Sequence, residues 1–263
     1  MYEFDFVKPT TLADAIAALG AEEAQALGGG QTLIPTLKQR LAAPAVLVSL
    51  TGIGEMQGIE LGEGQITIGG ATPHAAVAAE VAAAYPALAA LAGNIGDPAV
   101  RNRGTIGGSL ANNDPSACYP AAALASGATI VTSNREIAAD DYFEGMFTTA
   151  LEDGELITAV RFPVPEAASY QKFEQPASRF ALVGVFVAKY PEGVRVAVTG
   201  AAEDGVFRWS EAEVALSADF SPAALEGIDC PAEGMIADLH GTAAYRAHLV
   251  KVMTRRAVMA AAG

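Results

Sequence analysis

The sequence predicts an α+β protein, and three observations lead to this fold class. Extended apolar runs and helical stretches alternate over residues 1–50. Two prolines, Pro163 and Pro165, then stop an apolar run that has the length of a strand. Beyond them, two long apolar runs flank a Pro191–Gly193 turn, and a helical stretch ends the chain. We therefore expect one part over residues 1–163 and a second over residues 164–263.

The N-terminal fifty residues predict two helices and two strands. Thr11 caps a stretch of helical periodicity that stops at Gly20. The triple glycine Gly28–Gly30 lies between an expected strand and an expected helix, and Pro35 suits the first turn of that helix. The expected ranges are residues 11–20 and about 35–41 for the helices, and residues 23–27 and 45–50 for the strands.

Residues 93–120 form an unusual segment, rich in glycine, proline, asparagine and aspartate (GNIGDPAVRNRGTIGGSLANNDPSACYP). A loop of this length inside a compact domain is usually functional or disordered, so we expect an irregular functional loop here. Regular elements are expected on both sides of it: strands from residue 65 and over residues 128–133, 157–162, 180–190 and 194–201, and helices over residues 73–84, 86–93, 120–127 and 242–262.

Composition bounds the classes of function. At 263 residues and 51% hydrophobic composition, the chain can bury roughly three quarters of its unfolded surface, which excludes disorder. The net charge of −14 argues against nucleic-acid binding, because phosphate backbones require a basic face. Two cysteines are too few for an iron–sulfur cluster, and the three histidines lie far apart, so we expect no metal in this chain.

The sequence shows no targeting or membrane segment. The N-terminal residues carry acids and a proline and lack the basic start of a signal peptide. No uncharged apolar run reaches the roughly 18 residues that a spanning helix needs. We therefore expect a cytoplasmic protein.

Two glycine-rich stretches are the best candidates for a ligand site. Glycine lets backbone N–H groups approach a ligand closely, and a helix N-terminus favours anions, so Gly28–Gly30 suits a pyrophosphate. A Rossmann fingerprint would need glycine where Leu33 stands, and a phosphate-loop motif needs Gly-Lys, which never occurs. A second pair, Gly107 and Gly108, follows further along the chain. Two such loops could grip one extended dinucleotide, although each alone also describes a simple turn.

These stretches resemble a known family. Residues 28–35 (GGGQTLIP) resemble its A-G-G-x-S-L-I-P loop, and residues 101–111 (RNRGTIGGSLA) resemble its R-N-x-G-T-I-G-G-N-L-A segment. The family is the FAD-binding medium subunit of molybdenum hydroxylases such as carbon monoxide dehydrogenase and xanthine dehydrogenase. The resemblance covers nearly the whole chain, including residues 170–187 (YQKFEQPASRFALVGVFV) and the Arg-Arg-Ala-Val of residues 255–258.

The resemblance implies a fold, a cofactor and a site. The fold would be a two-lobed FAD-binding domain of the vanillyl-alcohol-oxidase (PCMH) type, with lobes of roughly residues 1–54 and 55–163. A small α+β domain, the carbon monoxide dehydrogenase flavoprotein C-terminal domain, would follow over residues 164–263. FAD would lie extended between the lobes. The residues that the resemblance assigns to it are Gly28, Gly29, Gly30, Gln31, Thr32, Leu33, Thr105, Ile106, Gly107, Gly108, Ser109, Asn112, Asp114, Lys172 and Phe180.

Several of these assignments are more specific. Lys172 and Phe180 would approach the isoalloxazine, although Phe180 could equally be core. Cys118 stands where the family often has an acidic residue near a ribityl or ribose hydroxyl, and Asp114 or Asn113 could replace that acceptor. Where relatives in the wider superfamily carry a histidine that bonds covalently to the flavin, this chain has Gln31, so its FAD would be dissociable.

Charged side chains near the second stretch have two readings. Arg101 and Arg103 could balance phosphate charge or could simply be solvated. We also expect Gly107→Val to abolish FAD retention while the chain stays folded, because the valine would occupy the place of the pyrophosphate.

The implied activity is that of a flavin subunit in a larger oxidoreductase. Substrate would be oxidised on a molybdenum-cofactor large subunit, and electrons would pass through a two-cluster iron–sulfur small subunit to the FAD and then to an external acceptor. The complex would be a dimer of heterotrimers. Two alternatives stay open: an autonomous FAD-dependent oxidase or dehydrogenase, and a flavin-free assembly or binding protein.

Overall fold

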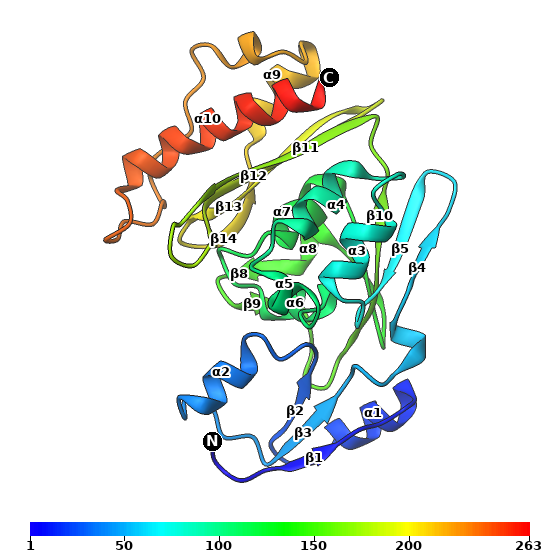
Figure 1. Cartoon of the computed structure of the whole chain (residues 1–263). Coiled ribbons are helices and arrows are strands. Elements are labelled where there is room, and N and C mark those ends of the chain that lie inside the picture. The colour runs from blue at the N-terminus through cyan, green and yellow to red at the C-terminus, as the bar shows by residue number, and fades with distance from the viewer.

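The computed structural model describes all residues, 1–263, and arranges them in three successive bodies (Figure 1). An N-terminal lobe with the start of the chain lies at one end, and the C-terminal sheet and helix lie at the other. A central lobe lies between them. Helices and separate sheets occur together in each body, so the predicted α+β class is confirmed. No helix is long and apolar enough to cross a membrane.

The N-terminal lobe is a small parallel sheet with two helices. Its strands run in the order β1-β3-β2, and β3 pairs in parallel with both neighbours. Thr11 caps the first helix by accepting a hydrogen bond from the Asp14 backbone, as its sequence predicts. Because the strands are parallel, their carboxyl ends meet at one edge, from which the triple glycine leaves. The elements are β1 (Asp5–Val7), α1 (Leu12–Leu19), β2 (Ala24–Leu27), α2 (Leu33–Lys38) and β3 (Val46–Ser49).

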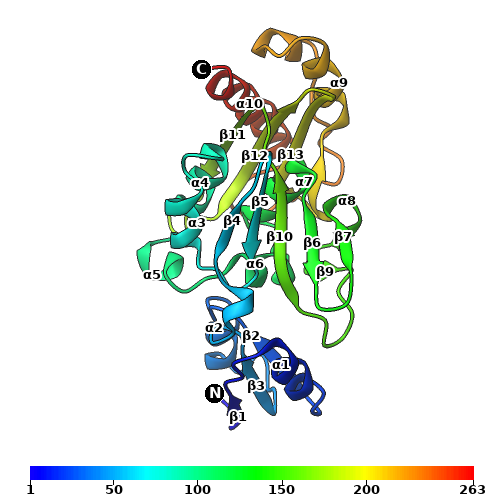
Figure 2. The same cartoon turned by 90° about the vertical axis from the view of Figure 1, so that its right-hand side faces the viewer.

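The central lobe is a five-stranded antiparallel sheet covered by helices (Figure 2). Its strands run in the order β4-β5-β10-β6-β7, and its core contains the buried faces of the alanine-rich helices. The strands are β4 (Ile59–Leu61), β5 (Gln65–Gly69), β6 (Thr129–Thr132), β7 (Glu136–Ala138) and β10 (Ile157–Pro163), with a separate hairpin of β8 (Phe143–Gly145) and β9 (Thr148–Thr149). The helices are η1 (Gly54–Met56), α3 (His74–Glu80), α4 (Pro86–Gly93), α5 (Pro98–Arg101), α6 (Ile106–Asn112), α7 (Tyr119–Ser126) and α8 (Ala139–Tyr142).

The C-terminal body is a four-stranded antiparallel sheet with the long last helix on one face. Arg246, buried in that helix, donates to the carbonyl oxygens of Leu182 and Gly200 and pairs with Asp238, which fixes the helix to the sheet. The opposite face packs on the central lobe, because Phe186 and Tyr190 belong to the central core. The elements are β11 (Ala167–Glu174), β12 (Ala181–Tyr190), β13 (Gly193–Ala202), β14 (Gly205–Arg208), α9 (Ser210–Ala218), η2 (Pro222–Leu225) and α10 (Ala243–Ala261).

Most expected elements are present, but the expectation for residues 93–120 was wrong in part. This segment contains two helices, α5 and α6, instead of one continuous irregular loop. Asp97 caps α5 and Thr105 caps α6, each through a side-chain oxygen that accepts a backbone N–H. The chain leaves the central sheet at Pro163 and enters the C-terminal sheet at Ala167. The division into domains at residue 163 stays a prediction.

Candidate functional site

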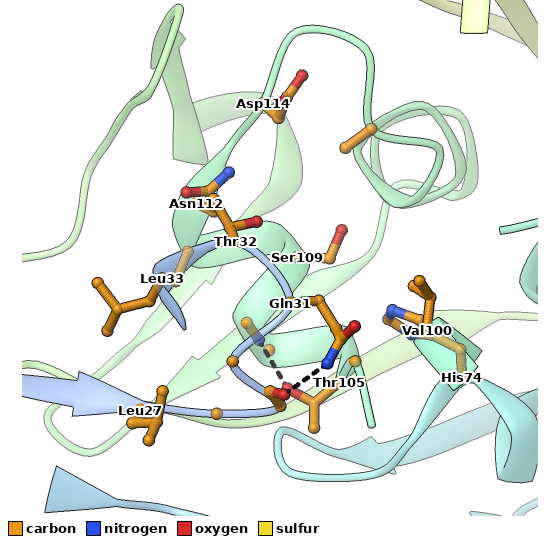
Figure 3. Close-up of a pocket in the computed structure, with 18 of the residues that line it drawn as sticks. Leu27, Gln31, Thr32, Leu33, His74, Val100, Thr105, Ser109, Asn112 and Asp114 are labelled. Atoms are coloured by element: carbon orange, nitrogen blue, oxygen red, sulfur yellow. Dashed lines mark hydrogen bonds between the residues drawn. The ribbon is translucent and has the colours of Figure 1, made fainter. Parts of the chain in front are cut away.

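A cleft of about 600 Å³ runs between the N-terminal lobe, the central lobe and the β11–β12 hairpin. Of the residues that the sequence assigns to the ligand, every one except Ile106 lines this cleft. A second cavity of about 480 Å³ shares Leu27 and Gly28–Gly30 with the cleft and continues toward Lys8 and Arg103. The two glycine-rich stretches, which lie far apart in the sequence, therefore meet in one crevice (Figure 3).

The first stretch, residues 28–33, presents a row of unused backbone donors. No hydrogen bond within the chain uses the backbone N–H of any residue from Gly28 to Leu33. Gly30 holds the turn with a positive φ of 72°, a conformation that glycine adopts at little cost. The Gln31 side chain donates back to the Gly29 carbonyl oxygen over 3.0 Å, which stabilises the turn. Gly28, Gly29, Gly30 and Leu33 are half-buried, and a partly buried N–H group normally has a partner, so this row before the first turn of α2 is suited to an anionic ligand. We call residues 28–33 the donor loop.

The donor loop touches the second stretch through backbone atoms. A Cβ atom added at Gly29 would lie 1.8 Å from the Arg103 carbonyl oxygen, and one added at Gly28 would lie 3.0 Å from the Thr105 hydroxyl. Only glycine fits at position 29, because the atoms it meets belong to the main chain. The absence of side chains brings the two lobes into direct contact at this edge of the cleft.

The second stretch does not act as a matching row of donors. The Ile106 and Gly107 N–H groups bond to the carbonyl oxygens of Thr72 and Gly70, and the Gly108 N–H bonds to the Thr105 hydroxyl. Gly107 is buried, and a Cβ atom there would lie 2.6 Å from the Gly70 carbonyl oxygen. Two expectations are thereby corrected. Ile106 belongs to the core and does not line the cleft, and Gly107→Val would collide with the main chain of Gly70, directly after β5, instead of leaving the fold intact.

The first turn of α6 contributes a part of the cleft wall without large side chains. Gly108 is exposed on the cleft side of this helix, and the Ser109 side chain projects beside it (Figure 3). The helix therefore opposes the donor loop with a face that has little bulk and one hydroxyl. A ligand can approach this face closely because no larger side chain stands there.

The residues that follow α6 divide between structure and cleft. Asn113 is buried with a left-handed φ of 41°, and its amide donates to the carbonyl oxygens of Gly145 and Thr148. Its amide NH₂ group thus holds the β8–β9 hairpin, and Asn113 does not line the cleft, which favours Asp114 as the acceptor in place of Cys118. Asn112 and Asp114 line the cleft, and Asp114 also accepts the Ser116 N–H over 2.8 Å.

The β11–β12 hairpin closes the other end of the cleft. The Lys172 ammonium donates to the carbonyl oxygens of Asn94 and Arg179, over 2.7 and 3.0 Å, and its side chain is almost fully buried. Arg179 lines the cleft with a left-handed φ of 62°, and Phe180 beside it is 49% exposed. Phe180 is therefore not a plain core residue, which removes one of the two readings that its sequence leaves open.

Cys118 lies in the cleft wall near Lys172 and Tyr170. It is buried, and burial raises the pKa of its thiol above the ordinary value, an effect that the nearby Lys172 ammonium opposes. A thiol with a raised pKa is neutral and unreactive at neutral pH, so Cys118 contributes shape and a weak hydrogen-bonding group.

His74 and Glu155 are among the cleft residues that the sequence analysis missed. His74, the first residue of α3, lines the cleft with its imidazole buried. Glu155 lines it from the loop before β10, where Arg135 and the Thr132 hydroxyl bind its carboxylate. Hydrogen bonding to Arg135 is the main reason why the pKa of Glu155 falls to about 2. No local sequence signal marks either residue, because only the tertiary packing brings them to the cleft.

The two arginines of the second stretch differ in their surroundings. Arg101 donates to the carbonyl oxygens of Ile95 and Gly96 and does not line the cleft. Arg103 lines the second cavity beside the donor loop, together with Lys8. Of the two, only Arg103 is placed to balance charge on a ligand that reaches this cavity.

Comparison with protein families gives one match that covers more than half of the chain. Residues 2–165 match the model of the FAD binding domain in molybdopterin dehydrogenase. The match includes the donor loop, α6 and the whole central sheet.

Several proteins with known names are similar to the chain over nearly its full length. The carbon monoxide dehydrogenase medium chain of Afipia carboxidovorans is 35% identical, with 97% of this chain and 95% of the relative covered. The nicotine 6-hydroxylase medium subunit of Paenarthrobacter nicotinovorans is 32% identical, with 97% and 96% covered. The solved structure of reconstituted CO dehydrogenase from Oligotropha carboxidovorans superposes with a TM-score of 0.87 at 33% identity, covering 99% of this chain and 98% of that chain.

Proposed function

The chain belongs to the family of FAD-binding domains in molybdopterin dehydrogenases, and we propose that it is the FAD-binding medium subunit of a molybdenum hydroxylase. The observation that carries the proposal is the donor loop: its residues line a cleft and their backbone N–H groups have no partner in the chain, while the first turn of α6 across the cleft presents Gly108 and Ser109 without bulky side chains. An extended dinucleotide diphosphate has the charge and the narrow middle that such a crevice accommodates.

The residues divide the binding work as follows. The donor loop, with Gly28, Gly29, Gly30, Gln31, Thr32 and Leu33, would bind the pyrophosphate through its N–H groups. Thr105, Gly107, Gly108 and Ser109 would form the opposing wall. Because an amide is not a nucleophile, Gln31 leaves the FAD non-covalently bound. The two cavities that meet at the donor loop give room for a ligand that extends to both sides of it.

The far end of the cleft would receive the isoalloxazine. Lys172 and Phe180 line the cleft from the β11–β12 hairpin, and Asn112 and Asp114 line it from the end of α6 and the residues that follow. Asp114 is the acceptor best placed to serve a ribityl or ribose hydroxyl where Cys118 stands in the wall. The Lys172 ammonium is already bound to backbone carbonyls and pairs with the Glu174 carboxylate over 3.4 Å, so it would contribute a fixed cation near the ring whose charge Glu174 partly balances.

When bound, FAD supplies two-electron and one-electron redox chemistry, and the chain positions and shields it. Relatives are named as medium subunits or medium chains, which are parts of multi-subunit enzymes. We infer that this subunit receives electrons from iron–sulfur clusters of a small partner subunit, that a molybdenum-cofactor large subunit oxidises the substrate, and that the complex is a dimer of heterotrimers. A cytoplasmic location also stays a prediction.

The central test is FAD binding by the purified full chain. The chain is freed of flavin and titrated with FAD, and binding is followed by flavin fluorescence and visible absorbance. Ser109→Asp adds a carboxylate that faces the donor loop, and we expect the dissociation constant to rise at least about tenfold, since one nearby like charge costs roughly 1.4 kcal/mol or more. Ser210→Asp adds the same charge on the exposed start of α9 and is the matched control.

The outcomes separate the proposal from its alternatives. A chain that binds no FAD is a flavin-free assembly or binding protein. A flavin that an added substrate bleaches without partner subunits identifies an autonomous oxidase or dehydrogenase. A folded Ser109→Asp variant with unchanged affinity would remove the donor loop and α6 from the site.

A further inference from the structure

His74 is a buried polar residue of the cleft wall that lacks a hydrogen-bond partner. It is 4% exposed, and its Nδ1 atom is sealed from solvent without a partner in the chain. The Nε2 atom also makes no hydrogen bond within the chain: burial and the charge of Arg101 are the only influences on the pKa of this imidazole. An unsatisfied buried polar atom is destabilising, so such groups usually meet a ligand, a water or another polar group. This imidazole therefore has a hydrogen bond to offer.

The ring of His74 is held in one place by its surroundings. Its backbone N–H donates to the Gly104 carbonyl oxygen over 3.0 Å. A Cβ atom added at Gly104 would lie 2.6 Å from Nε2, so the glycine leaves the space that the imidazole occupies. The ring of Tyr119 lies behind it, with the centroids 5.2 Å apart. In Figure 3 the imidazole extends from the α3 side of the cleft toward the donor loop, next to Val100.

The imidazole is neutral at physiological pH. Burial, and secondarily the positive charge of Arg101, lower the pKa of His74 to about 4. A neutral imidazole carries its proton on one nitrogen only. A sealed N–H without an acceptor is more costly than a sealed lone pair, so the proton belongs on Nε2 and the sealed Nδ1 is left unprotonated. His74 thus offers the cleft a single uncharged donor.

We propose that His74 is a positioning residue of the cofactor site, whose Nε2–H donates a hydrogen bond to an acceptor atom of the bound FAD. The proposal rests on the proposed function, because the ligand is FAD. Gly104 helps to position His74, because a side chain at residue 104 would occupy the space of the imidazole ring. The donor loop supplies the pyrophosphate with backbone donors, whereas His74 adds a directed side-chain donor on a different wall of the cleft.

The first experiment measures FAD affinity in the flavin-free full chain. His74→Phe keeps a flat ring and removes both nitrogens, and we expect the dissociation constant to rise about tenfold, the equivalent of one lost hydrogen bond. His74→Gln restores a donor near the position of Nε2 and should return the constant to within about threefold of the unmodified chain. His248→Phe, the same change at an exposed position of α10, is the control and should leave affinity unchanged.

The second experiment observes the ring nitrogens directly. In the chain labelled with ¹⁵N-histidine, the His74 signals are assigned by their loss in His74→Gln, which separates them from those of His240 and His248. We expect a protonated Nε2 and an unprotonated Nδ1 at neutral pH, and a shift of the Nε2 signal when FAD is added. This measurement reports a contact without depending on enzyme activity.

The outcomes distinguish this proposal from the proposed function. If the unmodified chain binds FAD and His74→Phe binds it equally well, the His74 proposal falls and the FAD site stands. Equal losses in the Phe and Gln variants, together with unchanged nitrogen signals on FAD addition, would make His74 a packing residue only. If the unmodified chain binds no FAD, both proposals fail.

Discussion

The donor loop and α6 are both glycine-rich, yet they have opposite relations to the cleft. In the donor loop the backbone N–H groups from Gly28 to Leu33 have no partner in the chain, and the residues that carry them line the cavity. In the first turn of α6 the N–H groups are bonded to Thr72, Gly70 and Thr105, so its glycines serve packing and access. A glycine-rich motif can therefore supply free N–H donors at one place and, at another, only leave space because it has no side chains. The tertiary partners of the N–H groups decide between the two.

The largest expected effect is on folding and comes from α6. Gly107→Val places branched bulk against the Gly70 carbonyl oxygen, and we expect it to lower the free energy of unfolding by about 3 kcal/mol. Urea denaturation followed by circular dichroism measures this loss. A variant as stable as the unmodified chain would mean that Gly107 does not pack tightly against Gly70, and the contrast with the donor loop would disappear.

The next effect is on affinity and comes from the donor loop. Gly30→Ala forces a side chain into a left-handed conformation, with its Cβ 2.8 Å from Ile34, so the loop and its N–H groups should reorient. We expect the FAD dissociation constant to rise about tenfold, which corresponds to roughly 1.4 kcal/mol. Titration gives the affinity, and urea denaturation of the same sample gives the stability. A variant that loses stability but keeps its affinity would contradict the assignment of binding to this loop.

A smaller effect is expected where the two regions meet. Thr105→Val removes the hydroxyl that caps α6, accepts the Gly108 N–H and lies against Gly28. Loss of a helix cap should lower the free energy of unfolding by about 1 kcal/mol. Thr105→Ser keeps the hydroxyl and should restore most of the stability. Equal losses in both variants would show that the methyl group, and not the cap, is important.

The smallest effect concerns pH and His74, on the α3 side of the cleft. The pKa of His74 is lowered from 6.5 to about 4, mainly by burial, so the unfolded chain binds a proton at a pH where the folded chain does not. Stability is therefore lost as pH falls through 6.5 toward 4. Between about pH 7.5 and about pH 6, this residue should account for roughly 0.8 kcal/mol of lost stability. His74→Phe should lack this component, and identical pH profiles for both chains would mean that the imidazole is open to solvent.

The sequence was most informative where local rules decide the structure. Thr11 and Thr242 mark helix starts because their side chains cap the first turn in the folded chain as well. Two apolar runs around a short turn predict a hairpin, and β12 and β13 pair in this way. α6 was missed because consecutive glycines disfavour helix, and only its bonds to Thr72 and Gly70 hold its first turn in place.

Most residues that the sequence predicts for the site line one cleft, but the sequence could not predict which of them offer free N–H groups and which only leave space. The cleft brings together the two glycine-rich stretches, Lys172 and Phe180, as the motifs suggest. The first two N–H groups of α6 are not free, because they bond to Thr72 and Gly70, which follow β5. No local sequence pattern predicts this tertiary contact. His74 was missed for a similar reason, because it becomes a cleft residue only through packing against Gly104.

The contact of Gly29 with Arg103 has a consequence for genetic suppression. Most tight contacts can be relieved by a compensating change, because a neighbouring side chain can be replaced by a shorter one. The atoms that would obstruct a side chain at Gly29 are main-chain atoms, which every amino acid possesses. A second mutation at position 103 could therefore not rescue a Gly29 variant, and a search for intragenic revertants should recover only glycine at position 29.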